Sequence, residues 1–145
     1  MHFSSRNSMN EYQKSILTVV QSIPYGKVMS YGQVAAYIGK PKEAREVGWM
    51  LQKLDADFPW WRVLNNAGLI SIKDNPQVNA QMQKELLEKE GIVVDGDFKL
   101  DMSTYRYYPN EATLKQLHLD PEYIEALLIK YTPIDKDEPL QLALF

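Results

Sequence analysis

The sequence predicts a mainly α-helical fold with a small β component, which contains a helix-turn-helix outline and a helical C-terminal extension. Three observations predict it. Apolar residues recur at helical spacing in several short segments, and most of these segments begin at a capping residue or end at Gly or Pro. Two of the helices are joined by a tight Gly/Pro turn. With 145 residues, 45% of them hydrophobic, the chain is long enough for one domain with a sizeable core.

The first half of the chain is expected to hold three helices. They are predicted from the capping box Ser8–Glu11 to Pro24, from the cap Ser30 to Gly39, and from about Lys42 to Leu54. The second and third form the outline of a helix-turn-helix, whose second helix lies against DNA. Many ordinary helical hairpins share this outline, so it is a weak signal by itself.

The second half is expected to combine short strands with further helices. Residues 97–100 have the composition of a short strand, and residues 69–73 that of a short strand or a loop. Helices are predicted from Asn75 to about Glu90 with Gly91 as C-cap, from Asn110, and from Asp120 with Pro121 at its first position. The expected divisions are a domain over 8–102, a helical extension over 103–131 and a flexible tail over 132–145.

Composition excludes several classes of protein. The chain has no cysteine, which excludes disulfides, thiolate metal sites and a cysteine nucleophile. Its two histidines, His2 and His118, are far apart in the sequence, so no metal or other cofactor is expected. No apolar run is long enough to span a membrane, and the first residues lack the apolar stretch of a signal peptide. We expect a cytoplasmic, nucleoid-associated protein.

Charge is distributed unevenly along the chain. The net charge is −3, yet residues 1–73 hold nine Lys/Arg against five Asp/Glu, while residues 74–145 hold seven against fourteen. A basic face on the first half would suit a phosphate backbone. Ordinary scatter of surface charge explains the same counts equally well.

Several motifs in order resemble the DNA-binding domain of O6-alkylguanine-DNA alkyltransferases. They are Ile23–Val28, Ser30–Gly32, Ala44–Gly48 and Pro59–Val63, the last standing where that family carries Pro-Cys-His-Arg-Val. The resemblance covers about residues 10–100 and implies a winged helix-turn-helix DNA-binding domain. No counterpart of the family's separate N-terminal domain is expected.

The departure from the family pattern falls on the reactive residues. Trp60 stands in place of the alkyl-accepting Cys, and Trp61 in place of the His that activates it. Glu90 corresponds to the third member of that relay and is expected to be left without partners. An indole offers no lone pair that a base can activate at neutral pH, so alkyl transfer is excluded. The pattern resembles the alkyltransferase-like proteins, which bind alkylated guanine without repairing it and mark it for nucleotide excision repair.

The resemblance also implies roles for individual residues. Arg45 would fill the space left in the base stack when a nucleotide is flipped out, Tyr31 would crowd the 3′ phosphate, and Trp60 would line the pocket. Lys73 would lie on a loop over that pocket. The implied DNA-binding residues are Ser30, Tyr31, Gln33, Arg45, Gly48 and Lys73, and the implied lesion-pocket residues are Tyr31, Trp60, Arg62, Val63 and Ser71. Binding would use the minor groove.

Each of these residues also has an ordinary structural interpretation. Tyr31 could pack on its own fold, Arg45 could pair with Glu neighbours, and one of the two tryptophans, assigned as Trp61, is expected in the core. Glu90 is expected to be a structural hydrogen-bond acceptor. Trp49 replaces a small residue of the family, and Glu46 puts an acid near the groove-facing helix. Both leave open how closely that helix approaches the DNA.

The C-terminal tail carries a separate signal. Residues Gln141, Leu142, Ala143, Leu144 and Phe145 resemble the bacterial sliding-clamp-binding pentapeptide, whose usual form is Gln-Leu-Ser/Asp-Leu-Phe. In that interpretation Gln141, Leu142, Leu144 and Phe145 bind the clamp after an acidic, Pro-interrupted tether, and the host is bacterial. The alternative is a tail that packs on its own domain.

The sequence therefore predicts a protein that binds double-stranded DNA containing alkylated guanine, with nucleotide excision repair proteins and the sliding clamp as further partners. A winged-helix regulatory or architectural DNA-binding protein without damage sensing is the alternative. A residual enzyme would require a nucleophile that the sequence does not contain.

Overall fold

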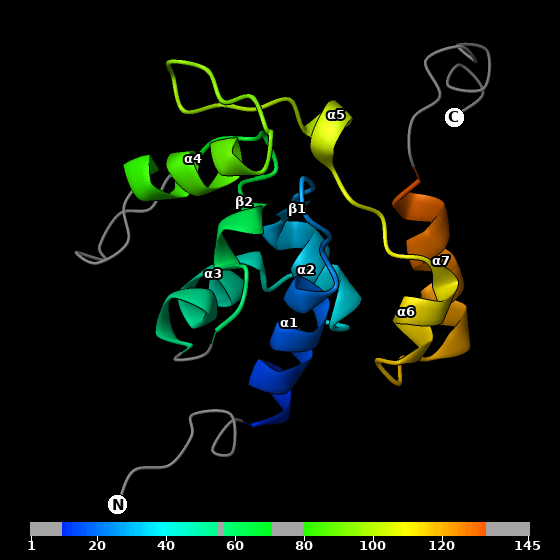
Figure 1. The fold of residues 1–145 in the computed structure, drawn as a ribbon. Helices are drawn as coiled ribbons and strands as arrows, with labels where there is room; N and C mark the ends of the chain where they lie inside the picture. The colour runs from blue at the N-terminus through cyan, green and yellow to red at the C-terminus, as the bar shows by residue number, and fades with distance from the viewer. Residues whose placement is uncertain (1–9, 55–56, 71–79, 133–145) are drawn as a thin grey trace, which may run out of the picture.

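A computed structural model describes residues 10–54, 57–70 and 80–132, which form helices around a very small sheet (Figure 1). The elements in order are α1 (Glu11–Gln21), β1 (Met29–Ser30), α2 (Tyr31–Tyr37), α3 (Ala44–Lys53), the 3-10 helix η1 (Trp60–Arg62), β2 (Val63–Leu64), α4 (Ala80–Lys89), α5 (Met102–Tyr105), α6 (Glu111–Lys115) and α7 (Pro121–Lys130). The predicted fold class, mainly α with a small β component, is confirmed.

Helix α1 begins later than the sequence predicted. Its cap is Asn10, whose side chain accepts from the Gln13 N–H at 2.8 Å, while the Gln13 side chain accepts from the Asn10 N–H at 3.1 Å. The predicted cap at Ser8 is therefore wrong, because an Asn two residues on, with Gln at the third helical position, forms the complete capping box. The apolar face, including Ile16 and Val20, is buried as predicted.

Helices α2 and α3 form the predicted helix-turn-helix. The capping box of α2 joins Ser30 and Gln33, as the sequence indicated, and the two helices pack against each other after a short turn. On α3 the side chains of Val47 and Leu51 are buried, and they are one helical turn apart. Helix α3 therefore has one face in the core and the opposite face in solvent.

Strands β1 and β2 run parallel, with Met29 opposite Val63. Two isolated bridges lie outside these strands: Val28 with Arg106 in parallel and Leu69 with Lys99 in antiparallel orientation. The segment expected as a strand at 97–100 thus pairs at one position, since Phe98 has a positive φ of 59° that turns the chain beside it.

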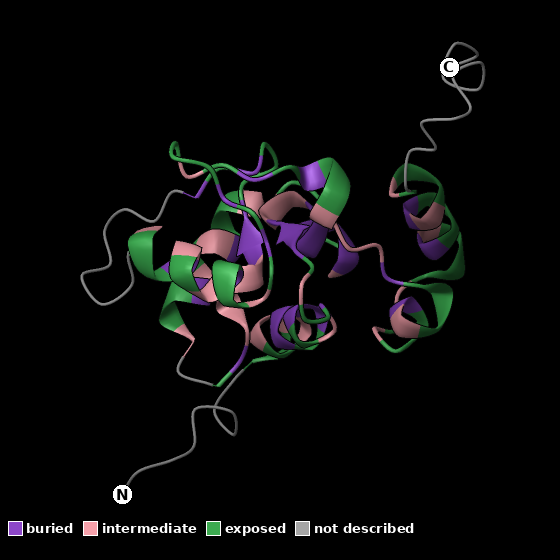
Figure 2. Cartoon of the chain, turned by 45° about the horizontal axis from the view of Figure 1, so that its top comes forward, coloured by how far each residue is buried: buried purple, intermediate pink, exposed green. Residues whose placement is uncertain are grey.

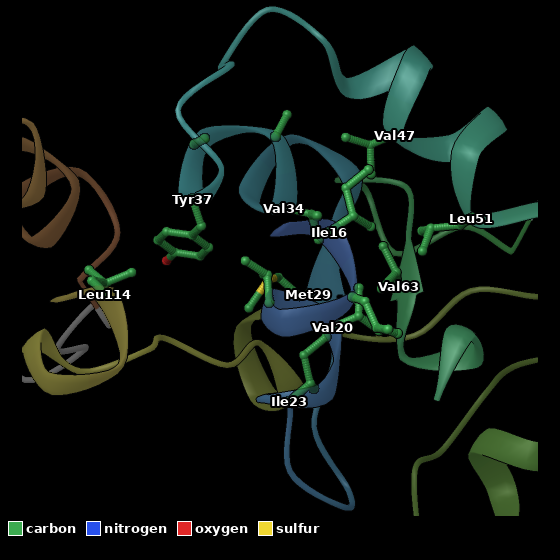
Figure 3. Packing of buried hydrophobic residues seen from close by; sticks show 14 of the residues in the cluster. Ile16, Val20, Ile23, Met29, Val34, Tyr37, Val47, Leu51, Val63 and Leu114 are labelled. Carbon is green, nitrogen blue, oxygen red and sulfur yellow. The ribbon is translucent and has the colours of Figure 1, made fainter. Parts of the chain in front are cut away.

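Two clusters of buried side chains make up the core. Figure 2 shows where buried residues lie along the chain, and Figure 3 shows part of the first cluster. The first lies among α1, α2 and α3 and includes Val63 of β2. The second gathers around α4 and the loops on either side of it, with Leu64 and Leu87 among its members. Because the parallel strands place Val63 in one cluster and Leu64 in the other, the short sheet joins the two halves of the core.

Helix α4 ends as the sequence predicted. Gly91 has a φ of +85°, its N–H bonds to the Glu88 carbonyl at 3.0 Å, and the Ile92 N–H bonds to the Leu87 carbonyl at 3.2 Å. These two bonds are the Schellman pattern, in which the residue with positive φ is usually Gly.

The C-terminal extension packs on the first cluster. Leu114, Ile124 and Leu127 belong to it, and Figure 3 shows Leu114 facing Tyr37 of α2. The Tyr123 hydroxyl donates to the Ala36 carbonyl at 2.5 Å. Helices α6 and α7 begin near the predicted caps, whereas the short helix α5 was not predicted. The proposed boundary at residue 102 stays a prediction.

Within the described ranges, no helix combines the length and apolarity that a membrane crossing requires. In the same ranges, no three His, Asp or Glu side chains gather in a way that could hold a metal ion.

Candidate nucleic-acid interface

Tyr31 is the first residue of α2, and its side chain lies close to α3. Its ring lies against Gly48 of α3, where an added Cβ would meet ring carbons at 3.7 and 3.8 Å. Burial raises the pKa of the Tyr31 phenol, so its hydroxyl stays protonated and able to donate at neutral pH. Two predicted DNA-binding residues, Tyr31 and Gly48, therefore lie together.

Ser30 and Gln33 are buried residues that form the capping box at the start of α2. Their relative exposures are 1% and 0%, so neither side chain reaches solvent. The Ser30 hydroxyl accepts from the Gln33 N–H at 3.0 Å, and the Gln33 amide donates to the Tyr107 carbonyl at 2.9 Å. Such contacts fix the backbone from which Tyr31 projects, which makes both residues positioning residues in this structure.

Arg45 lies in the first turn of α3 and is exposed. Among the described residues it makes no hydrogen bond or ion pair, including with Glu46 beside it. The ordinary interpretation of Arg45, a surface residue paired with Glu neighbours, is not what the structure shows. The guanidinium is free to engage a partner from outside the protein.

Trp60 and Trp61 share η1 but pack on different sides. Trp60 is partly buried against the first cluster and Trp61 against the second, and their rings meet edge to face with centroids 5.9 Å apart. Neither ring is fully buried, so the assignment of Trp61 rather than Trp60 to the core stays a prediction. The side-chain amide of Gln83 in α4 donates to the carbonyls of Trp61 and Val63, both at 3.0 Å, and so fixes the backbone around η1.

Glu90 is surrounded by donors, and the expectation that it lacks partners is wrong. The Trp61 indole N–H donates to Oε2 at 2.6 Å, the Gly26 N–H donates to Oε1 at 2.8 Å, and the Arg62 guanidinium binds both oxygens at 2.8 to 3.0 Å. The indole N–H at position 61 donates a hydrogen bond to the carboxylate although no cysteine is present for a relay to activate. Glu90 is thus the structural acceptor that the sequence analysis described.

Two opposing effects act on the Glu90 carboxyl. Burial raises the pKa of Glu90, because the side chain is only 4% exposed. The hydrogen bonds from Arg62, Gly26 and Trp61 and the charge of Arg62 lower the pKa by more than burial raises it. The pKa therefore lies below its ordinary value. Glu90 is ionised at neutral pH and forms a buried ion pair with Arg62.

Arg62 and Val63, both predicted in the lesion pocket, have internal contacts. Besides Glu90, the Arg62 guanidinium donates to the Ile23 carbonyl at 2.9 Å and lies over the rings of Tyr25 and Trp61. Val63 is 1% exposed in the first cluster. The predicted residues Ser71 and Lys73 lie outside the described residues.

Arg106 is a site residue that was not predicted from the sequence. Its guanidinium donates to Gln33 Oε1 at 2.7 Å, to the Ser30 hydroxyl at 3.3 Å and to the Asn66 side chain at 3.0 Å. It thereby joins the start of α2 to the turn after β2. Only its place in the run Tyr105–Tyr108, where the only charge stands among aromatic residues, sets it apart in the sequence.

A known family model identifies the protein family to which the chain belongs. Residues 11–92 match the family model described as "6-O-methylguanine DNA methyltransferase, DNA binding domain". The chain belongs to this family. The match includes every predicted DNA-binding residue and the Trp60–Trp61 pair, and it ends directly after the Glu90 network.

Relatives within the 6-O-methylguanine DNA methyltransferase family include proteins named for other activities. Alkyltransferase-like protein 1 of Schizosaccharomyces pombe is 38% identical over 107 residues, which is 70% of this chain and 98% of that protein. The DNA base-flipping protein of Vibrio parahaemolyticus is 38% identical over 103 residues, 70% of this chain and 100% of the relative. That of Escherichia coli is 36% identical over 100 residues, 68% and 75% of the two chains.

The structural match is consistent with these relatives. The crystal structure of the S. pombe protein in complex with damaged DNA containing O6-carboxymethylguanine superposes with a TM-score of 0.64, at 38% identity, over 70% of this chain and 98% of that one. A second complex of the same protein with DNA gives 0.62. The winged helix-turn-helix-like fold predicted from the sequence is confirmed.

Proposed function

We propose that this protein recognises O6-alkylguanine in duplex DNA by flipping the nucleotide out of the helix, and that it does so without transferring the alkyl group. The observation that carries the proposal is the free, exposed Arg45 on α3, one helical turn before the Gly48 that Tyr31 lies against, in a chain whose structural relative was crystallised with O6-carboxymethylguanine DNA. A flipped base leaves a gap, and a guanidinium plane fits such a gap while bonding the orphaned base.

The absence of alkyl transfer follows from the residues at the reactive position. The chain contains no cysteine, and Trp60 occupies the place of the acceptor. An indole ring has neither an activatable lone pair nor a pKa that a neighbour can bring to neutrality. Glu90, which would complete a relay, is committed to Arg62, Gly26 and Trp61. Mass spectrometry after incubation with alkylated DNA should show no added alkyl mass.

Trp60 supplies the apolar surface for the alkyl group in this proposal. Its ring packs edge to face on Trp61, whose indole is bonded to Glu90, so it is held in one orientation. A rigid indole beside a pocket offers apolar area and one N–H donor. Because O6-alkyl groups differ from guanine mainly in apolar volume, such a surface favours the lesion over the normal base.

A titration of labelled duplexes with and without O6-methylguanine tests the proposal. The wild-type protein should prefer the lesion duplex, and affinity for both duplexes should fall as salt rises. Arg45→Ala should lose most of the preference, while Lys115→Ala, which removes an exposed cation on α6, should keep it. Equal binding of lesion and plain DNA by the wild type, together with selection of one sequence, would instead assign a regulatory or architectural role.

Presentation of the lesion to nucleotide excision repair is a further part of the proposal. A protein that binds damage tightly but cannot remove it is useful only if another system acts on the complex. The test is co-purification of excision-repair proteins on lesion duplex in the presence of the protein. Recovery that is the same with Arg45→Ala as with wild type would contradict it.

We also propose that residues Gln141, Leu142, Leu144 and Phe145 bind the bacterial sliding clamp; they lie outside the described residues. The sequence Gln-Leu-Ala-Leu-Phe after a polar tether supports this. A pull-down with purified clamp should retain the full chain and lose the chain without its last five residues. Equal retention of both would refute it. A cytoplasmic, nucleoid-associated location follows from these partners and is tested by fluorescence microscopy.

A further inference from the structure

Trp49 lies on the exposed side of α3, one helical turn after Arg45. Its relative exposure is 59%, which is high for so large an apolar side chain. Residues four and seven positions apart share one face of a helix, so Arg45, Trp49 and Gln52 form a stripe. The buried residues Val47 and Leu51 hold the opposite face in the core. Trp49 therefore points away from the protein on the same side as Arg45.

The surface beside Trp49 combines an apolar ring with polar and cationic groups. An open hollow of about 320 Å³ is lined by Trp49, Gln52 and Lys53. It thus offers one flat apolar surface, one amide and one ammonium group. A nucleotide backbone presents the matching groups, since a deoxyribose is largely apolar on its open face and the neighbouring phosphate is anionic.

We propose that Trp49 is a second DNA-contacting side chain of α3, packed against the deoxyribose wall of the minor groove next to the step that Arg45 enters. Lys53 then lies at the adjoining phosphate. The proposal rests on the proposed function and adds to it the residue that sets how closely α3 approaches the DNA. Continuity with Arg45 and the charge of Lys53 select DNA rather than an apolar protein surface as the occupant.

Apolar packing on sugars has a different signature from the contact of Arg45. Every duplex has the same deoxyribose wall, so loss of the indole should weaken binding to lesion and plain DNA by the same factor, about tenfold. No counterion is released by an apolar contact, so the slope of log K against log salt should not change. Lys53→Ala, by contrast, should reduce that slope by about one.

The experiment compares Trp49→Ala, Trp49→Phe and Ile129→Ala with wild type on both duplexes at several salt concentrations. Trp49→Phe retains an aromatic face and should recover most of the affinity. Ile129 is 74% exposed on α7, on the other side of the molecule from α3 in Figure 1, and its loss should change nothing. Acrylamide quenching of tryptophan fluorescence adds a direct readout, because DNA should protect Trp49 as well as Trp60, and the protection should be smaller in Trp49→Phe than in wild type.

The outcomes separate the inference from the function on which it rests. If the wild type shows no lesion preference but Trp49→Ala still weakens binding equally on both duplexes, the proposed function fails and this contact stands. The contact does not exist if Trp49→Ala binds plain DNA as well as or better than wild type, and if DNA addition reduces acrylamide quenching by the same amount in both proteins. Concentration-dependent self-association that Trp49→Ala abolishes, with DNA affinity unchanged, would assign the face to a second copy and also overturn the inference.

Discussion

Replacing Glu90 by Gln is the sharpest test of how the core supports the site. The change keeps the shape of the side chain but removes its negative charge and places an NH₂ group among donors. Arg62 then remains 14% exposed with no anion beside it, and the N–H groups of Gly26 and Trp61 compete for a single carbonyl oxygen. Breaking one side of a buried ion pair in this way destabilises a protein by about 3 to 5 kcal/mol.

Partial exposure of Arg62 sets the expected loss at the lower end, about 3 kcal/mol of the free energy of unfolding. For a chain of this length that corresponds to a fall in Tm of about 10 °C. Trp61→Phe loses only one hydrogen bond to a charged acceptor and should fall by about 1.5 to 3 kcal/mol. Chemical unfolding in urea at neutral pH measures both.

The pH dependence gives an independent check. Since the pKa of Glu90 is lower in the folded protein than the ordinary glutamate value of 4.5, its stabilising contribution is present above that value and is lost as the pH falls through the folded pKa. Wild type should therefore lose stability below about pH 4.5, and Glu90→Gln should lose less over the same range. A Glu90→Gln variant within about 0.5 kcal/mol of wild type at neutral pH would refute the reasoning.

Three further substitutions test the supports of the site. Gly68→Ala should lower the free energy of unfolding by at least about 1 to 3 kcal/mol, because φ is +84° and the new Cβ would meet the Leu100 carbonyl oxygen at 2.2 Å. Thermal unfolding measures this loss, and an unchanged Tm would contradict the prediction. Arg106→Ala should lose about 2 kcal/mol in urea unfolding, because the Gln33 acceptor loses its charged donor; a loss below 0.5 kcal/mol would argue against that bond. Ser30→Ala should lose about 1 kcal/mol by the same assay through loss of the α2 cap, and a cap that can be removed without any change in stability would be inconsistent with the observed bond to Gln33.

Local signals in the sequence predicted the helices well. The cap at Ser30, the turn between α2 and α3 and the end of α4 at Gly91 each depend on neighbouring residues, so short-range chemistry is sufficient to place them. The start of α1 was misplaced by two residues because Ser8 and Asn10 both have capping side chains. Helix α5 was missed because four residues carry no helical period.

Long-range contacts explain what the sequence did not predict. The partners of Glu90 come from positions 26, 61 and 62, and the partners of Arg106 from positions 30, 33 and 66. No periodicity or short motif relates residues so far apart in the chain. The resemblance to the family pointed to Glu90 only as a member of a reactive relay, and so it suggested a group whose partners had been lost.

The Trp61–Glu90 bond separates the structural role of the relay position from its chemical one. A carboxylate that is buried needs donors whether or not a nucleophile stands nearby, because an unpaired buried charge is costly. Trp61 meets this need through its indole N–H while adding a ring that packs on Trp60. A residue at position 61 that kept an N–H donor on a smaller, more polar ring would leave Glu90 satisfied and give Trp60 less support. Trp61→His is that change: it should preserve stability better than Trp61→Phe, yet weaken lesion preference more. The reverse order in paired urea and DNA titrations would show that the ring of Trp61 does not position Trp60.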